Sequence, residues 1–318
     1  MIYKKENADN ITLNVDEEII EYTRDNKVYK NMDKNNMENT YVYSNLFIGE
    51  LNEENTNGDM LKYYMDNEKK YIVNFEYMEG QNNIDAKMRK ILVDWLVEVV
   101  VEFGLKIKTL YLCVNIMDRF LSKKSVARNK LQLVGITALM IAVKYEENKH
   151  LNIRDYSFIS NYTYTISEIL DMEFIILNTI DFNLTITTIP MLLTYYHTCL
   201  NLNSNIKFLS QYICELSIQE LKYLKYTPST IAKSSIILSD IINKIPYTLH
   251  EDKTEYPLTK YIFNLENHPD NQDCIKFLYK LLLSQTNSEQ RNIYKQYCLK
   301  KHNQVALLLE KISDFIKI

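Results

Sequence analysis

Apolar residues recur every three or four positions from Asp85 nearly to the C-terminus, and they almost never alternate with polar residues. This spacing predicts α-helices and argues against strands. Asp85 is a candidate N-cap for the first long helix, and Gly104 is a candidate stop for it. Further helices are expected at residues 109–122, 129–148, 152–160, 165–180, 188–201, 204–225, 228–244, 258–265, 270–285 and 287–315. The predicted fold class is therefore all-α.

Residues 1–56 differ from the rest of the chain in composition. They are rich in Asn, Asp, Glu and Lys and contain few aliphatic pairs at helical spacing. Such a segment buries too little apolar surface to offset the entropy lost on ordering, so we predict a disordered N-terminal tail. Residues 57–84 are expected to hold a short helix near Asp59–Lys70 and a connector that contains Gly80.

Two of the expected helices share a pattern of small residues on an otherwise apolar sequence. Their small residues follow the same three-then-four spacing, and they are Gly135, Ala138 and Ala142 in one helix and Ala232, Ser235 and Ser239 in the other. Small side chains on one stripe allow another backbone to approach closely. Coincidence is one interpretation of this match. The other is a repeat, with two similar helical bundles that each surround a central helix.

The composition argues against several classes of function. The five cysteines are far apart and the five glycines are isolated, so neither a zinc ribbon nor a phosphate-binding loop is expected. The net charge of −4 includes no basic block, which argues against nucleic acid and membrane surfaces as partners. We also find no membrane span and no signal peptide, so the expected location is the nucleus and cytoplasm. A binding protein without cofactor or metal is therefore favoured over an enzyme.

The segment "MRKILVDWLVEVVVEF", residues 88–103, carries the only tryptophan of the chain. Its apolar residues cover more than one side of a helix, so the helix is either buried all round or presents an exposed patch to a partner. Arg89 lies in this apolar setting and needs a carboxylate partner. Asp118, in the equally apolar "IMDRF", is the expected one. The pair is predicted to be a structural ion pair that fixes how two helices meet.

Several segments in this order strongly resemble the cyclins, closest to the mitotic B type and next to the A type. They are "MRKILVDWLVEV", "TLYLCVNIMDRFLS", "KLQLVGITALMIAVKYEE", "YTYTISEILDMEFIIL" and "YLKYTPSTIAKSSIILS". The likeness runs from about residue 60 to the C-terminus. It implies two tandem five-helix cyclin boxes, at 85–184 and 185–318, with a further C-terminal helix in the second range. It also implies a regulatory subunit that binds and activates a cyclin-dependent protein kinase, recruits its substrates and controls mitotic entry.

The resemblance implies a substrate-docking groove on the first long helix. In cyclins the corresponding apolar residues receive Arg-x-Leu-type peptides of substrates and inhibitors, and here they are Met88, Ile91, Leu92 and Trp95. Glu98 would meet the basic residue of the peptide, and Gln132 would meet its backbone. We therefore expect an exposed patch in which the tryptophan supplies contact area.

The resemblance also implies a kinase-binding surface. The central pair of that surface matches Lys144 in "AVKYEE" and Glu173 in "DMEF", and its apolar contacts match Tyr145, Leu177 and Phe182. The competing interpretation is a solvated ion pair beside three core residues. The sequence departs from the usual cyclin pattern in three ways that concern the rim of this surface. Lys90 replaces a small residue, Val143 replaces a serine, and the usual Pro-Pro turn is missing.

The tail contains "KEN" at Lys5, Glu6 and Asn7, which matches the destruction signal that a ubiquitin ligase reads on mitotic cyclins. One alternative function is a transcription-associated cyclin with a different kinase. Another is a cyclin-fold transcription factor that binds DNA. The latter predicts a basic face and an N-terminal zinc ribbon, and the sequence has neither.

Overall fold

The computed structural model describes residues 56–148, 151–200, 202–251, 269–284 and 292–307. Within these ranges the chain consists of helices and connecting segments, without a strand, as the apolar spacing predicts. Every helix in the described ranges is too short or too polar to cross a membrane. The predicted tail at 1–56, the KEN segment and the helix expected at 258–265 lie outside the described residues, apart from Thr56.

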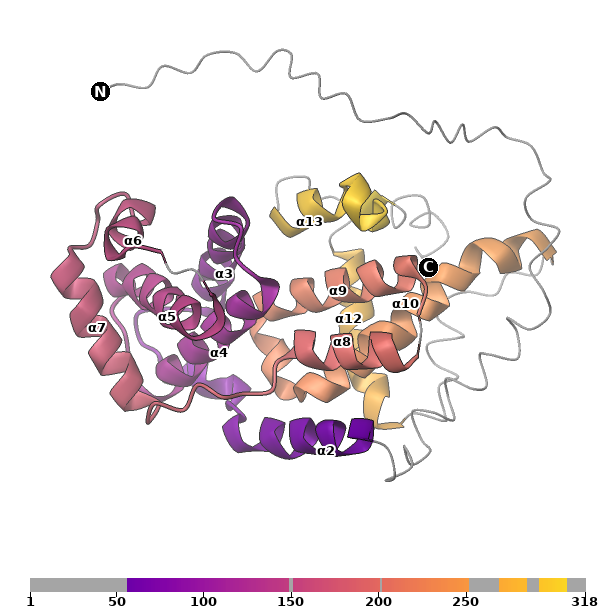
Figure 1. Cartoon of the computed structure of the whole chain (residues 1–318), viewed down its shortest axis with the longest axis horizontal. Helices are drawn as coiled ribbons and strands as arrows, with labels where there is room; N and C mark the ends of the chain where they lie inside the picture. The colour runs from indigo at the N-terminus through magenta and orange to yellow at the C-terminus, as the bar shows by residue number, and fades with distance from the viewer. Residues whose placement is uncertain (1–55, 149–150, 201, 252–268, 285–291, 308–318) are drawn as a thin grey trace, which may run out of the picture. The chain divides into compact units, whose positions relative to one another are not determined.

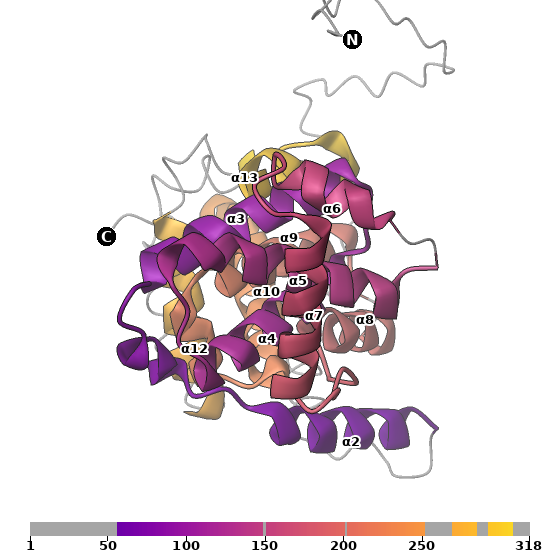
Figure 2. The ribbon, with the colours of Figure 1, turned by 90° about the vertical axis from the view of Figure 1, so that its left-hand side faces the viewer.

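The first bundle surrounds helix α5. Its helices are α3 (Ala86–Glu102), α4 (Ile107–Lys123), α5 (Leu131–Glu146), α6 (Ile153–Ile159) and α7 (Ile166–Thr179). Helix α5 contacts the other four, and Figure 2 views this bundle from the side of α7. Every residue from Leu133 to Val143 is buried, which is why this stretch is apolar on all sides.

The second bundle repeats this plan around helix α10. Its helices are α8 (Ile189–Cys199), α9 (Ser204–Gln219), α10 (Pro228–Glu251), α12 (Pro269–Leu283) and α13 (Asn292–Tyr297). Helix α10 contacts α8, α9 and α12, and the side chains of Ala232, Ser235 and Ser239 are fully buried. The predicted pair of central helices with small residues is therefore confirmed (Figure 1).

Local signals at the helix ends behave largely as the sequence predicts. The Asp85 side chain accepts a hydrogen bond from the Met88 backbone N–H at 2.8 Å, so it caps the first long helix. Gly104 has a φ of +62°, a conformation that glycine adopts without strain and that ends this helix. Helix α7 begins with a capping box between Thr165 and Glu168.

Two expected helices are interrupted within the described residues. The helix expected at 204–225 stops at Gln219 and continues as the 3₁₀ helix η5 (Leu221–Lys225). The helix expected at 287–315 is also broken, into α13 and the 3₁₀ helix η6 (Lys300–His302). The backbone after η6 has a φ of 52° at both Asn303 and Gln304, which an α-helix cannot accommodate.

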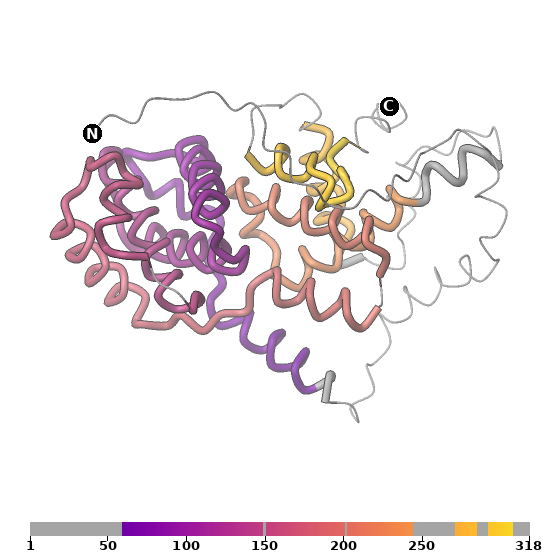
Figure 3. Tube along the Cα trace, turned by 45° about the horizontal axis from the view of Figure 1, so that its top comes forward, coloured from indigo at the N-terminus to yellow at the C-terminus, as the bar shows by residue number. Residues whose placement is uncertain are grey.

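The N-terminal helix α2 (Thr56–Glu68) contacts α8 and α10 of the second bundle, although it precedes the first in sequence. Figures 1 and 3 show it below the second bundle. The Glu68 carboxylate accepts hydrogen bonds from the Ser229 backbone N–H at 2.8 Å and from its hydroxyl at 2.7 Å. A negative charge is favourable there because Ser229 lies in the first turn of α10. The connector continues through η2 (Lys69–Tyr71) and η3 (Phe75–Gly80).

A buried ionic cluster joins the two bundles. Arg89 of α3 donates two hydrogen bonds of 2.7 Å to the Asp118 carboxylate of α4, and both side chains have no exposed surface. The same guanidinium donates to the backbone carbonyls of Ile218 and Gln219 at the end of α9, at 3.0 and 3.2 Å. The expected Arg89–Asp118 pair is therefore present, and it also reaches the second bundle.

Two tyrosines complete this cluster. The hydroxyls of Tyr77 and Tyr223 donate to the two oxygens of Asp118, at 2.8 and 3.0 Å. Burial, and then the Asp118 charge, raise the pKa of both phenols, so they remain protonated donors. Burial by itself would lower the pKa of Arg89, but Asp118 more than compensates, and the net direction is upward.

Replacing Arg89 with alanine should lower the free energy of unfolding by about 3–5 kcal/mol, because Asp118 would remain buried without its cation. Lys90→Ala is the matched control. Lys90 also forms an ion pair across the boundary between the two bundles, with Glu220, but these two side chains are 29% and 32% exposed. We expect Lys90→Ala to lower the free energy of unfolding by at most about 1 kcal/mol. Urea denaturation of both variants measures the difference, and equal midpoints would contradict it.

Candidate protein-interaction surfaces

An ion pair joins Lys144, in the last turn of α5, to Glu173, in the middle of α7, and both carboxylate oxygens take part in it. The Lys144 ammonium lies 2.6 and 2.8 Å from the two carboxylate oxygens. The Lys144 side chain is 49% exposed and the Glu173 side chain 16%. The pair is thus presented at the surface rather than enclosed in the core.

The three apolar residues predicted beside this pair occupy different environments. Tyr145 is 46% exposed, and its hydroxyl lies 2.6 Å from the Thr185 hydroxyl. Phe182 is 61% exposed, and Leu177 is half-buried. The competing interpretation of three core residues is therefore wrong for Tyr145 and Phe182. We call Lys144, Tyr145, Glu173, Leu177 and Phe182 the α5–α7 face.

A strained turn holds Phe182 at the surface. Asp181 and Phe182 both have a φ of 55°, in the left-handed region that costs energy for residues with a Cβ. The turn is fixed because the Phe182 N–H donates to the Leu177 carbonyl at 2.9 Å, and Arg119 donates to the carbonyls of Ile180 and Asn183. Strain that the surroundings maintain in this way is typical of functional positions.

Helix α7 exposes further apolar side chains that sequence reasoning missed. Ile166, Leu170, Phe174 and Ile175 are 36%, 46%, 69% and 46% exposed. The first three recur every four residues and so share one stripe of the helix. The sequence contains that stripe as a second apolar side of the helix, distinct from the side of the buried residues Ile169 and Ile176. It extends the α5–α7 face along the helix.

The predicted docking residues lie on and beside α3, and most of them are accessible. Ile91 is 61% exposed, Glu98 is exposed, and Met88, Trp95 and Gln132 are half-buried. Trp95 packs against a buried cluster of the first bundle that consists of Leu133, Ile136, Met140, Tyr156, Tyr164 and Ile169. We call Met88, Ile91, Trp95, Glu98 and Gln132 the α3 patch. The tryptophan therefore both packs and presents surface.

Leu92 does not belong to the exposed set, and the expectation that it does is wrong. Its side chain is only 6% exposed. A Cβ added to Gly135 would lie 2.8 Å from the Leu92 Cδ1 atom, so Leu92 fills the space that the glycine leaves open. The small residue on α5 thus allows α3 to approach closely, and Leu92 is part of that contact.

Three charged residues of α3, Arg89, Lys90 and Asp94, contact the second bundle. Asp94 accepts a hydrogen bond from the Gln219 side chain at 2.9 Å, and Lys90 pairs with Glu220. Together with Arg89 they contact the three residues at the end of α9. Lys90, one of the departures from the cyclin pattern, therefore has a partner in the seam between bundles.

No group of His, Cys, Asp and Glu in the described part of the chain could hold a metal ion. All five cysteines are free thiols, and Cys298 lies in the turn after α13 while the other four lie in helices.

The chain matches two consecutive family descriptions, "Cyclin, N-terminal domain" over residues 59–185 and "Cyclin, C-terminal domain" over residues 184–311. The viral cyclin of herpesvirus saimiri has the same fold, with a TM-score of 0.55 at 18% identity over 70% of this chain and 98% of the viral protein. The tandem bundles are thus cyclin boxes, and the protein belongs to the cyclin family.

Its curated relatives include mitotic cyclins of both types. Cyclin-B2-1 of Oryza sativa subsp. japonica is 43% identical over 178 residues, which are 56% of this chain and 42% of the relative. G2/mitotic-specific cyclin-A of Hydra viridissima is 36% identical over 255 residues, which are 79% of this chain and 59% of the relative. The chain thus spans about half the length of these two relatives.

Leu92 and its neighbour Ile91 provide a matched test of the α3 patch. Leu92→Ala should lower the free energy of unfolding by about 2–5 kcal/mol, because it leaves a cavity above Gly135. Ile91→Ala removes an exposed side chain and should change it by no more than about 0.5 kcal/mol. Thermal and urea denaturation measure both. Similar values for the two variants would mean that the close approach of α3 to α5 is misplaced.

Proposed function

We propose that this chain is the regulatory subunit of a cyclin-dependent protein kinase, which it binds and activates. It recruits substrates to the kinase and acts at entry into mitosis, while the catalysis belongs to the kinase. The observation that carries the proposal is the surface ion pair of Lys144 and Glu173, on the same two helices and the following turn that expose Tyr145, Phe174 and Phe182. Membership of the cyclin family supports it.

The geometry of the pair suits contact with a polypeptide backbone. The Lys144 ammonium has three N–H donors, and its two hydrogen bonds to Glu173 leave one for a partner carbonyl. The Glu173 carboxylate retains lone pairs for a partner N–H. Because each charge already compensates the other, the pair can be covered by a partner without leaving an unpaired ion.

The apolar side chains around the pair would supply the buried area. Tyr145, Phe174 and Phe182 are aromatic and between 46% and 69% exposed. Aromatic residues are enriched in the energetic centres of protein interfaces. A kinase that covers them would also exclude water from the Lys144–Glu173 pair, which strengthens its hydrogen bonds to the kinase backbone.

Three further parts of the proposal concern the biological setting. The G2/mitotic-specific name of the Hydra relative supports a mitotic role. The α3 patch would receive Arg-x-Leu-type segments of substrates or inhibitors, with Glu98 opposite their basic residue. The KEN segment at Lys5–Asn7 would be read by a ubiquitin ligase, and the complex would act in the nucleus and cytoplasm.

Glu173→Lys should abolish kinase activation while the fold survives. The change places two like charges where the kinase would remove them from water, and the loss of binding should be roughly thirtyfold or more. Lys130→Glu is the matched control. It reverses one charge of another ion pair, Lys130–Glu168 at 2.9 Å, which joins the residue that precedes α5 to the first turn of α7. Phosphorylation of a short peptide measures activation, and full activity of Glu173→Lys would show that the α5–α7 face does not bind the kinase.

Trp95→Ala and Glu98→Lys should reduce phosphorylation of a substrate that docks through an Arg-x-Leu segment. Activity on a short peptide without that segment should persist, because the α5–α7 face is unchanged. The effect of Glu98→Lys should be larger at low salt, since it acts on a charge at an exposed site. Initial rates on the two substrates measure the separation, and an equal loss on both would contradict a docking role for the α3 patch.

A further inference from the structure

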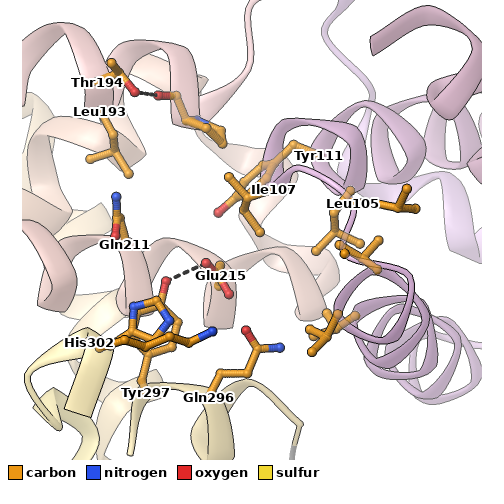
Figure 4. A pocket seen from close by; sticks show the side chains of 17 residues that line it. Leu105, Ile107, Tyr111, Leu193, Thr194, Gln211, Glu215, Gln296, Tyr297 and His302 are labelled. Atoms are coloured by element: carbon orange, nitrogen blue, oxygen red, sulfur yellow. Dashed lines mark hydrogen bonds between the residues drawn. The ribbon is translucent and has the colours of Figure 1, made fainter. Parts of the chain in front are cut away.

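A cleft of about 360 Å³ lies between the two cyclin boxes. Figure 4 shows its two walls. Leu105, Ile107 and Tyr111 come from the first box, while Leu193, Gln211 and Glu215 come from the second, where the segment that follows α13 also contributes. Its volume lies within the range of binding pockets, about 300–1,000 Å³. None of the residues of the α3 patch or the α5–α7 face lines it.

Glu215 is a carboxylate within this cleft, and it is 7% exposed. Tyr297 donates a hydrogen bond of 2.5 Å to its Oε1 atom. None of the ion pairs among the described residues involves Glu215. Burial raises the pKa of Glu215 to about 7, although the Tyr297 hydrogen bond acts in the opposite direction. The cleft therefore holds an acidic group without a compensating cation.

Two basic residues also line the cleft, and neither compensates Glu215. Burial, and then the charge of Lys301, lower the pKa of His302, so its imidazole is neutral near pH 7. Lys301 is exposed, which keeps it largely in water. A cation that pairs with Glu215 must therefore come from outside the described part of the chain.

Two of the exposed residues that line the cleft are apolar. Val101, at the end of α3, is 48% exposed, and Ile107, at the start of α4, is 38% exposed, while Thr194 and Lys301 are exposed polar residues of the same lining. A side chain with an apolar stem and a cationic end matches exposed apolar residues beside a buried acid. A free amine would leave Val101 and Ile107 uncovered, whereas the residues that flank a basic side chain in a polypeptide would cover them.

We propose that the inter-box cleft is a further docking site, which receives a lysine or arginine side chain from an apolar segment of a partner protein, with Glu215 as its counter-ion. The site goes beyond the proposed function, because it requires neither the kinase nor the α3 patch. The pairing would give a buried carboxylate that lacks a counter-ion a charge-assisted hydrogen bond between partners.

The test uses the full chain without kinase and fluorescently labelled nine-residue peptides. The flanking positions are mixtures of Val, Ala and Ser, and the central residue is Lys, Arg, norleucine or Glu. Fluorescence anisotropy should show the Lys and Arg pools binding about tenfold tighter than the norleucine pool. Glu215→Gln should remove this difference, because it keeps the shape and the Tyr297 hydrogen bond but not the charge.

Three controls define the site. Lys301→Met should strengthen binding of the Lys pool by removing a like charge that repels the peptide cation, and Trp95→Ala should leave it unchanged. Ile107→Ser should weaken it, which gives a second measurement should Glu215→Gln fail to fold.

Affinity for the Lys pool should also rise between pH 6 and 8 as Glu215 ionises. The other titratable groups near Glu215 are Tyr111, Cys214, Tyr297, Lys301 and His302. Burial raises the pKa values of the two tyrosines and of the thiol, so these three groups stay protonated across this pH range.

Several results would overturn the proposal. Equal binding of the Lys, Arg and norleucine pools would show that the cleft does not recognise a cation. Preference for the Glu pool, lost in Lys301→Met, would make it an anion site. If n-butylamine competes as strongly as the Lys pool binds, the flanking residues add nothing and the site takes a small cation. A loss in Trp95→Ala equal to that in Glu215→Gln would place binding on the α3 patch.

Discussion

The paired charges of Arg89 and Asp118 are the interaction on which the arrangement of the two boxes depends. Neither side chain has any exposed surface, so each needs the other, and two hydrogen bonds of 2.7 Å join the guanidinium to the carboxylate. Asp118 takes hydrogen bonds from Tyr77 of the connector and Tyr223 of η5, and Arg89 reaches the carbonyls at the end of α9. One ion pair thus connects the N-terminal connector, the first box and the second box.

This seam has consequences for the surfaces on either side of it. Helix α3 carries the α3 patch on one side and contacts the end of α9 through Arg89, Lys90 and Asp94 on another. Its C-terminal end then forms one wall of the inter-box cleft. Helix α3 thus contributes to all three, and Glu98 of the α3 patch directly follows Val97, which lines the cleft.

The α5–α7 face, which we propose binds the kinase, has its polar groups already fixed by contacts within the chain. The Lys144–Glu173 pair is already formed, and the strained turn at Asp181 and Phe182 is held by hydrogen bonds from Arg119 and from the backbone. Groups that are fixed in advance lose little entropy on binding. The energetic cost of the strained turn is thus borne by folding rather than by complex formation.

The sequence by itself determined the all-α class, both central helices, the cap at Asp85 and the partner of Arg89. Each of these follows from short-range spacing or from the rule that a buried charge needs a counter-charge. Pattern and resemblance together also placed the α5–α7 face. The second apolar stripe of α7, with Leu170 and Phe174, was present in the same pattern but was not used.

Only the tertiary structure decided which apolar residues are exposed and what the second box contributes. Leu92 and Ile91 are adjacent and both aliphatic, yet Leu92 is buried because Gly135, 43 positions further along the chain, leaves space for it. Glu215 and Ile107 likewise share a cleft although they belong to different boxes. Helical periodicity describes one helix at a time, so it cannot reveal contacts between distant helices, and these contacts determine both the buried surface and the cleft.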